Sequence, residues 1–437
     1  MHLYQLTLSF VAFALLAGNS GAQLAGNSGA QTVAPRDPAP ITLDAVIREA
    51  LANNPAIQSA RENWEAMKAR VPQARAWDDP KVSFQDAAGR FVSVPGNAFA
   101  DQMLSAEQMI PVSGKNLAGG RAADAEAVAA YEQLRRTELD VQAAAMSAYF
   151  RLGDAYAQID LNRQNLVSLQ QIELVSRSKY AVGGEGAVFV LSAETECGKL
   201  LEMSRDLELQ LATQQSKLNV VLGRDAFAPI GQPAAEPELP PAPSRETLEA
   251  IMFRSRPEIL IAAAKVRQQQ ALLQLAHRQW IPDPALGVIA QRYNGAAQGV
   301  SEVDAVVSFN IPWVNARKYS AGVDEAQHQL QAAEADLERA RQEAVGALRE
   351  AVENLETNHH HSELFRDKLI PQAQQVFEAS QLEYEAGKLG FDDWIAAERT
   401  LRDLEAEERE HLTKYESAYA DLQAVVGQSL LPSIKNQ

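Results

Sequence analysis

The sequence of 437 residues contains one cysteine, Cys197, and only 6% of its residues are aromatic. A single cysteine excludes an intramolecular disulfide, a C-x-x-C redox motif and a cysteine-rich zinc site. The formal net charge is −17, and no run of Lys and Arg occurs, which argues against nucleic acid as a partner. Beyond residue 40 no apolar stretch is long enough for a helical membrane span. The abundance of Ala, Leu, Gln and Glu instead predicts long helices.

The N-terminus is typical of an exported protein. Residues 6–16 form an apolar run, too short to cross a bilayer, and small residues follow it. The segment 16–23 recurs as 24–31, so a signal peptide within residues 1–30 has two candidate cleavage points, after Ala22 and after Ala30. No cysteine lies near either point, and we therefore expect no lipid anchor.

A series of local signals recurs in the same order in the two halves of the sequence, which indicates an internal repeat. We predict two copies, residues 41–227 and 244–431, joined by a proline-rich linker at 228–243. The paired signals are Asn54-Pro55 with Arg256-Pro257, Asp79-Pro80 with Asp283-Pro284, Ile110-Pro111 with Ile311-Pro312, Tyr180 and Gly183 with Tyr384 and Gly387, and Gly223 with Gly427.

Each copy reads as a helix, a β-hairpin, a very long helix, a turn and a shorter returning helix. At about 1.5 Å per residue, a helix of roughly seventy residues would reach on the order of 100 Å, too long for a globular core. Apolar residues spaced by three and four, such as Leu200, Met203 and Leu207, indicate a coiled-coil seam. Pro55 and Pro257 predict breaks in the first helices. The expected helices cover residues 43–76, 112–182 and 187–222, then 248–279, 314–386 and 391–426.

The hairpins follow the Asp-Pro pairs. Strands of roughly ten residues would suit tilted membrane-spanning strands, although a soluble hairpin also fits the imperfect alternation. Four strands cannot close a barrel, so a membrane location would require an oligomer. The strands are indicated by Val82, Phe84 and Phe91–Val94 before Gly96-Asn97, and by Leu286–Ile289 and Val303–Ile311 around Asn294-Gly295.

The two helix turns carry related motifs. They read Tyr180-Ala-Val-Gly183-Gly-Glu-Gly186 and Tyr384-Glu-Ala-Gly387-Lys-Leu-Gly390, followed by Ser192-Ala193-Glu194 and Ala396-Ala397-Glu398. These glycine-containing turns are expected to supply the positive φ angles that a tight helix reversal needs. With the repeat and the hairpins, these motifs resemble the TolC family of outer-membrane efflux proteins over essentially the whole mature chain. Pro282–Pro284 and Asn53-Asn54-Pro55 resemble in particular its heavy-metal branch, of the Czc and Cus type.

The resemblance implies a mainly α fold with a membrane β-barrel. Four strands from each protomer of a homotrimer would form a twelve-stranded barrel in the outer membrane, and the helices would form a tunnel through the periplasm. The protein would be a passive exit duct, not an enzyme, with no cofactor. Its partners would be a periplasmic adaptor, docking at Gly183, Gly186, Gly387 and Gly390, an inner-membrane pump of the RND type, and outer-membrane lipid.

The resemblance to the heavy-metal branch of the family favours heavy-metal cations as the cargo. Drug efflux and type I secretion remain alternatives within the same family. An alternative from another class is a periplasmic coiled-coil adaptor, which also uses long helical hairpins. Adaptors usually carry one hairpin between β-rich domains, whereas this sequence repeats the whole unit.

The resemblance places acidic gate residues just after the second turn. Asp393 occupies the first of the family's two aspartate positions, with Asp392 beside it, while Ala396 stands at the second; Glu185 is the nearby acid of the first turn. A ring of such carboxylates would bind cations or resist closing. Asp392 and Asp393 equally suit the first turn of a helix, where the helix dipole stabilises acids.

Two further features invite a chemical interpretation. Consecutive helical residues point about 100° apart, so His359, His360 and His361 cannot converge on one ion from one helix, although a pair from neighbouring chains could. A solvated helix face is favoured, and no metal site is predicted. Cys197 lies in a returning helix and is expected to be a small packing residue.

Overall fold

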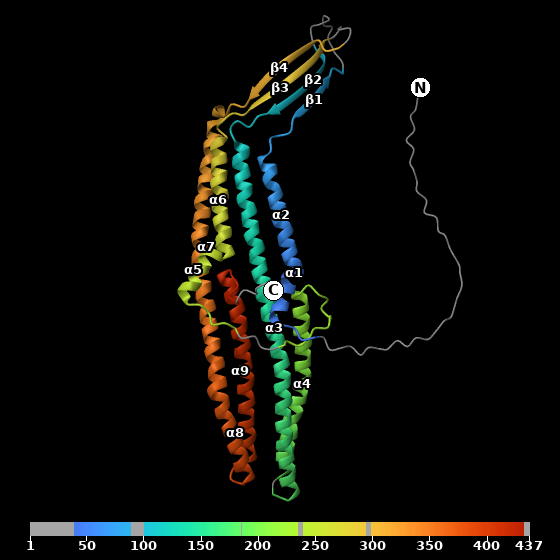
Figure 1. Cartoon of the computed structure of the whole chain (residues 1–437), viewed down its shortest axis with the longest axis vertical. Helices are drawn as coiled ribbons and strands as arrows, with labels where there is room; N and C mark the ends of the chain where they lie inside the picture. The colour runs from blue at the N-terminus through green and yellow to red at the C-terminus, as the bar shows by residue number, and fades with distance from the viewer. Residues whose placement is uncertain (1–38, 89–99, 185, 235–238, 294–298, 432–437) are drawn as a thin grey trace, which may run out of the picture. The chain divides into compact units, whose positions relative to one another are not determined.

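The computed structural model describes residues 39–88, 100–184, 186–234, 239–293 and 299–431. Within these ranges the chain is mainly helical, with one four-stranded antiparallel sheet, and the same order of elements occurs twice (Figure 1). None of the described helices is both long and apolar enough to cross a membrane. Several predictions lie outside the described residues: the signal peptide, the strand at Phe91–Val94, both hairpin turns and the position of Glu185.

The helices and strands follow the expected order closely. The first half contains α1 (Leu43–Asn53), α2 (Pro55–Arg75), β1 (Lys81–Asp86), β2 (Ala100–Met109), α3 (Lys115–Ala181) and α4 (Ala187–Val221). The second half contains α5 (Arg245–Ser255), α6 (Pro257–Arg278), β3 (Pro284–Tyr293), β4 (Glu302–Phe309), a 3₁₀ turn (Pro312–Asn315), α7 (Ala316–Leu364), a π-helical turn (Phe365–Leu369), α8 (Ile370–Glu385) and α9 (Phe391–Val426).

The predicted breaks before Pro55 and Pro257 are confirmed. Asn54 is extended between α1 and α2, and its side-chain oxygen accepts a hydrogen bond from the Ala56 N–H at 2.9 Å, which caps α2. Its amide nitrogen donates to the Val221 carbonyl, also at 2.9 Å, and so ties the break to the end of α4. Arg256 has a similar extended backbone between α5 and α6.

Residues of two recurring sequence signals, the helix-ending glycines and the helix breaks, lie close together in the structure. Gly223 and Gly427 end the two returning helices with φ angles of 71° and 78°, conformations that favour glycine. A Cβ on Gly223 would lie 2.7 Å from the Asn53 carbonyl oxygen, and one on Gly427 would lie 2.6 Å from the Ser255 carbonyl oxygen. In each half, therefore, the end of the returning helix lies against the break in the first helix.

The long helices are as long as predicted, with one local irregularity. α3 has 67 residues, which corresponds to on the order of 100 Å. α7 passes directly into α8 through the π-helical turn, in which the Ile370 N–H donates to the Phe365 carbonyl. Pro371 follows at once; because proline lacks an N–H and clashes with the preceding turn, a wider turn lets the helix continue.

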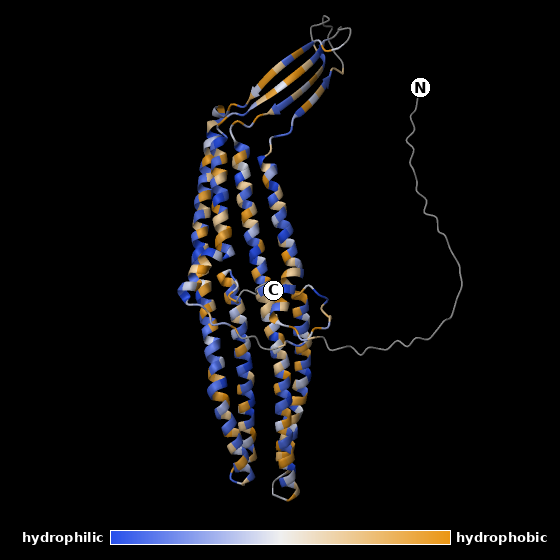
Figure 2. Ribbon diagram, viewed as in Figure 1, coloured by the Kyte–Doolittle hydropathy of each residue, from blue (hydrophilic) through white to orange (hydrophobic). Residues whose placement is uncertain are grey.

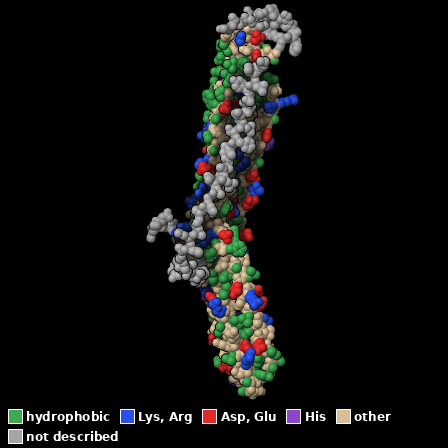
Figure 3. All heavy atoms as spheres, turned by 90° about the vertical axis from the view of Figure 1, so that its right-hand side faces the viewer, with side chains coloured by type: hydrophobic (Ala, Val, Ile, Leu, Met, Phe, Trp, Pro, Cys, Tyr) green, Lys and Arg blue, Asp and Glu red, His purple; other side chains and the backbone are tan. Residues whose placement is uncertain are grey.

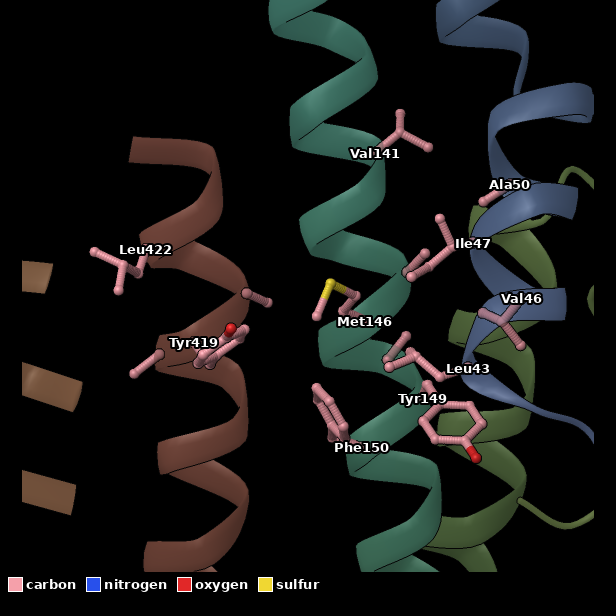
Figure 4. Packing of buried hydrophobic residues seen from close by; sticks show 14 of the residues in the cluster. Leu43, Val46, Ile47, Ala50, Val141, Met146, Tyr149, Phe150, Tyr419 and Leu422 are labelled. Carbon is pink, nitrogen blue, oxygen red and sulfur yellow. The ribbon is translucent and has the colours of Figure 1, made fainter. Parts of the chain in front are cut away.

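The main hydrophobic core lies where α1, α3, α4, α5, α7 and α9 meet. Val46 and Ile47 of α1 lie on one side of α3, whereas Met146 of α3 points to the other side, toward Tyr419 of α9 (Figure 4). Backbone hydrogen bonds join the linker to the segment just before α1. The Ile41 N–H donates to the Gln232 carbonyl at 3.0 Å, and the Ala234 N–H donates to the Ile41 carbonyl at 2.8 Å. In the predicted α4 seam, Leu200, Leu207, Leu218 and Leu222 are buried, but Met203 is exposed.

The two hairpins form one sheet in the order β1-β2-β3-β4, because β2 pairs with β3 across the two halves. β2 and β3 have the expected ten residues, whereas β1 has six and β4 has eight. The register places apolar side chains in rows on one face. Two of these rows are Val82, Ala106, Val288 and Ala305, and Phe84, Leu104, Ala290 and Val303. Figure 2 shows hydrophobic and hydrophilic residues following one another along the strands.

The other face of the sheet is largely polar. The Ser83 and Ser105 hydroxyls are 2.7 Å apart, and the Ser308 hydroxyl donates to a Glu107 carboxylate oxygen at 2.9 Å. On the apolar face Val82 is 69% exposed and Phe84 is 65% exposed, so the described chain does not cover this face. In the space-filling view, apolar side chains gather at the sheet (Figure 3).

Candidate functional site

The two helix turns reverse the chain between α3 and α4 and between α8 and α9. Gly183 and Gly387 have φ angles of 74° and 71°, which confirms the predicted left-handed conformation at these two residues. In the same two motifs, Gly186 and Gly390 have negative φ angles, −80° and −77°. These residues are the N-caps of α4 and α9, and an extended backbone is usual at an N-cap.

The space around the turns is open. Apart from its own chain neighbours, a Cβ on Gly183, Gly186 or Gly387 would meet no atom of the described residues within 4 Å. At Gly390 the nearest atom to such a Cβ would be an Asp393 carboxylate oxygen, at 3.4 Å. The turn glycines are therefore not required by close packing within this chain, which leaves their backbone accessible from outside.

Asp392 and Asp393 occupy the first turn of α9, and both are exposed. Acidic side chains there stabilise a helix through its dipole and its free N–H groups. The structure therefore gives both residues a local stabilising position while keeping their carboxylates at the surface. The third predicted gate residue, Glu185, lies outside the described residues.

Behind the turns lies a second, smaller core in which the two halves meet. Tyr384 stacks on Trp394 with ring centroids 4.8 Å apart, and Phe189 of α4 lies 5.4 Å from Phe391 of α9. Cys197 is buried in this core, which confirms its prediction as a packing residue. Burial, with the nearby Glu173 carboxylate, raises the pKa of the Cys197 thiol and so disfavours the reactive thiolate.

Lys179 links the two turns directly. Its ammonium group donates to the Tyr384 carbonyl at 2.6 Å and lies 3.6 Å from the centroid of the Tyr384 ring. The first contact is a charge-assisted hydrogen bond and the second a cation–π interaction. Lys179 belongs to α3 and Tyr384 to α8, so these contacts connect the first helical hairpin with the second.

A buried ion cluster joins α4 to α9 beside this core. Glu196 of α4 has a side chain only 4% exposed; its carboxylate accepts from Arg399 of α9 at 2.7 Å and from Lys199 at 2.7 Å. Arg402 of α9 lies 3.7 Å from the same carboxylate. Burial alone would raise the pKa of the Glu196 carboxyl group, but the hydrogen bonds from Lys199 and Arg399 outweigh the effect of burial, and the pKa of Glu196 is lowered.

Glu398 is the second buried carboxylate of this cluster, and its environment differs. Its closest ion-pair contact is Arg402, at 3.4 Å, and its side chain is only 4% exposed. Burial raises its pKa to about 7; Arg402 opposes this shift in part and the negative Glu196 adds to it. At neutral pH the cluster therefore contains one firmly ionised carboxylate and one that is close to half protonated.

This cluster is not predictable from local sequence patterns. Glu398 stands in the motif that follows the second turn, and Glu196, Arg399 and Arg402 belong to no motif of their own. One signal was available: Glu398 continues the spacing of the buried Phe391, Trp394 and Ile395 along α9, so it falls on an apolar face. The pairing with Glu196 could not be found, because it depends on how α4 and α9 meet.

The three consecutive histidines diverge, as predicted. His359 and His360 are exposed on α7, whereas His361 is half-buried and its ring lies 4.7 Å from that of His411 on α9. Burial and the neighbouring His361 lower the pKa of His411. In the described ranges, no group of three or more His, Cys, Asp or Glu side chains is arranged around a metal position.

Two repeated helical hairpins that carry a sheet with one apolar face are the architecture of an outer-membrane efflux channel. A family model described as outer membrane efflux protein matches residues 46–224 and 252–428. The chain therefore belongs to the outer membrane efflux protein family, as the turn motifs and the repeat had suggested.

Two heavy-metal resistance proteins are among its relatives. The chain is 24% identical over 406 residues to the cobalt-zinc-cadmium resistance protein CzcC of Cupriavidus metallidurans, covering 90% of this chain and 91% of that protein. It is 22% identical over 311 residues to the nickel-cobalt-cadmium resistance protein NccC of Alcaligenes xylosoxydans xylosoxydans, covering 70% and 68%.

Solved structures of the same fold include CusC, with a TM-score of 0.77, 18% identity and coverage of 93% of this chain and 96% of that one. The Campylobacter jejuni outer membrane channel CmeC has a TM-score of 0.73 at 18% identity and covers 94% of each chain. These likenesses confirm the predicted fold class, in which long helices accompany a small antiparallel sheet.

Proposed function

We propose that this protein is the outer-membrane exit duct of a tripartite efflux system. It acts as a homotrimer that extends into the periplasm, together with a periplasmic adaptor and an inner-membrane pump of the RND type. Heavy-metal cations are its cargo. The duct is passive, because the pump supplies the energy. The observation that carries this proposal is the two-faced sheet.

The apolar face of the sheet suits contact with lipid. Val82, Phe84, Leu286 and Val307 are each about half exposed or more, and they stand on the same face as the rows described above. Burying such side chains in hydrocarbon stabilises them by about 25 cal/mol per Å². The polar face, with Ser83, Ser105 and Glu107 among its residues, suits a water-filled interior.

The sheet edges argue for an oligomer. Within the described residues, β1 and β4 pair on one side only, which leaves their outer N–H and C=O groups without strand partners. Unpaired backbone groups cost several kcal/mol each in hydrocarbon. Pairing β1 of one copy with β4 of the next removes both edges, and three copies would give the twelve strands that the family resemblance implies.

The opposite end of the helices serves as the periplasmic entrance in this proposal. The open surroundings of Gly183, Gly186, Gly387 and Gly390 suit docking of an adaptor against the two turns. Asp392 and Asp393, together with Glu185 of the first turn motif in the sequence, are the residues of the proposed acidic ring. The net charge of −17 favours cations along such a path.

The cargo is inferred from the relatives. The two resistance proteins are named for cobalt, zinc, cadmium and nickel. Exposed aspartates at an entrance fit divalent cations better than large apolar drugs. Drug efflux and type I secretion are the alternative cargo classes. They are tested by comparing metal, drug and protein export in a strain that lacks its own duct but retains the adaptor and pump of the metal system.

Disulfide crosslinking tests the closed oligomer. In a Cys197→Ala background, Ser83→Cys on β1 is combined in turn with Asp304→Cys, Val306→Cys or Ser308→Cys on β4. We expect interchain disulfides in at least one pair and a ladder that ends at the trimer. Met103→Cys on the inner strand β2, with the same β4 cysteines, is the control. A monomer in detergent without interchain disulfides would refute the proposal.

Single-channel recording tests the acidic entrance. In planar bilayers, Asp392→Ala combined with Asp393→Ala should reduce cation selectivity and block by divalent ions, whereas Asp336→Ala on α7 should not. Unchanged selectivity in the double variant would remove these two residues from the gate and leave only their role at the start of α9.

A further inference from the structure

His361 and His411 face each other from neighbouring antiparallel helices. Their rings are 4.7 Å apart at 78°, one on α7 and one on α9. The other two histidines of the run point elsewhere: His359 lies against Tyr415 with ring centroids 4.8 Å apart, and His360 is exposed. A second imidazole therefore comes from another helix of the same chain, which the sequence pattern did not suggest.

A carboxylate accompanies this pair. Glu408 lies three residues before His411 on α9, and side chains with this spacing share one face of a helix. A Glu408 carboxylate oxygen lies 3.5 Å from the hydroxyl of Ser362, the residue after His361. Glu408 and His411 are therefore both directed at the same turn of α7. A Glu-x-x-His pair of this spacing holds metal ions in helical bundles.

Two details set this place apart from an ordinary helix contact. The Nδ1 atom of His411 is buried and has no hydrogen-bond partner among the described residues, although buried polar atoms are normally paired. The π-helical turn of α7 begins four residues after His361, and its Phe365 ring lies 5.3 Å from the His411 ring. Such turns occur frequently at functional sites.

We propose that His361, His411 and Glu408 form a binding site for one divalent transition-metal ion that joins α7 to α9. Two imidazoles and a carboxylate suit Zn²⁺, Co²⁺ and Ni²⁺, with water completing the coordination. The three side chains do not already surround one point in the described chain, so binding requires side-chain rotation. The site is accordingly weaker than a preformed structural zinc site.

This site is distinct from the acidic entrance of the duct. It lies within one chain, and it binds metal whether or not the duct transports metal. Equilibrium binding to the purified protein therefore tests the site, while export assays and crosslinking test the proposed function. A negative result in one experiment leaves the other intact.

The experiment uses the full-length protein in detergent with a tag that contains no histidine. After chelator treatment, Co²⁺ binding is followed by its visible absorption, and Ni²⁺ and Zn²⁺ binding by calorimetry. His361→Ala and His411→Ala should each weaken binding at least about tenfold, and Glu408→Gln by a smaller factor. The matched control is His360→Ala, an exposed neighbour in the same run, which should stay within about twofold of the unchanged protein.

His411→Asn serves as a second variant, because it keeps a polar side chain beside Phe365, and circular dichroism checks that each variant is folded. Equal losses in His360→Ala and His361→Ala would overturn the site by showing an exposed histidine patch instead. Full binding by folded His411→Asn would overturn the role of α9. Absence of one-to-one binding by the unchanged protein would overturn the proposal altogether.

Discussion

Replacing Glu398 with glutamine should stabilise the contact between α4 and α9 at high pH and leave it unchanged at low pH. Glu398 is buried beside Arg402 and Glu196, and its pKa is about 7, compared with a usual value of 4.5. A carboxyl group whose pKa is raised by folding is easier to ionise in the unfolded state. The stability that it contributes is present below pH 4.5 and is lost as the pH rises to about 7.

The size of the effect follows from the same values. The rise from 4.5 to about 7 corresponds to about 3 kcal/mol, because each tenfold change is about 1.4 kcal/mol. Glutamine has nearly the same shape and no charge, so Glu398→Gln should avoid this cost above pH 7. Arg402 keeps an ionised partner in the variant, since Glu196 lies 3.7 Å away.

Hydrogen exchange of the α9 amides, read by mass spectrometry and corrected for intrinsic rates, measures the local opening free energy. We expect the two proteins to agree near pH 4 and to diverge by up to about 3 kcal/mol at pH 8, with Glu398→Gln the more protected. Glu202→Gln, at an exposed position of α4, should show no such trend. A difference independent of pH, or lower protection of Glu398→Gln at pH 8, would refute the reasoning.

Two further substitutions test the fold. Gly427→Ala should lower the free energy of unfolding by about 2–4 kcal/mol in thermal melts, because φ is 78° and the new Cβ would lie 2.6 Å from the Ser255 carbonyl oxygen. The control is Gly346→Ala, which lies in open space within α7 and should be neutral or stabilising. Asp283 is buried, which by itself would raise the pKa of its carboxyl group, but hydrogen bonds from Ser113 and Lys115 have the larger effect and lower that pKa. The stability that Asp283 contributes is therefore lost on acidification below 3.8, the usual pKa of an aspartate. Asp283→Asn should lower the free energy of unfolding by about 2 kcal/mol at neutral pH and make it depend less on pH in the acid range. If the variant kept the full acid dependence, that dependence would belong to another group.

The regular elements could be predicted because their signals are local. Pro55 and Pro257 marked the helix breaks, and the glycine turns marked the ends of α3 and α8 to within a few residues. The motifs predicted that each turn uses a glycine with positive φ, but not which one; it is Gly183 in one turn and Gly387 in the other, while Gly186 and Gly390 serve as extended N-caps. The π-helical turn was not predicted, because Pro371 marks an irregularity without fixing how the helix absorbs it.

The candidate site was only partly visible in the sequence. Asp392 and Asp393 were found from a motif, and the structure places them at the exposed start of α9. The buried cluster around Glu196 was missed, since the two members of each interhelix pair are about two hundred residues apart and nothing local to either predicts the other. His411 was missed for the same reason: a lone histidine on a charged helix carries no signal until α7 is placed beside it.

By itself the sequence determined the repeat, the long helices and the family resemblance, because helix periodicity, proline and glycine act over a few residues. The tertiary structure decided how these parts combine. Pairing of β2 with β3 fixed the register, and with it the sorting of apolar and polar side chains to opposite faces of one sheet. Contact between α4 and α9 brought Glu398 into an environment that holds its pKa near neutrality, because burial and neighbouring charge depend on three-dimensional proximity rather than on position along the chain.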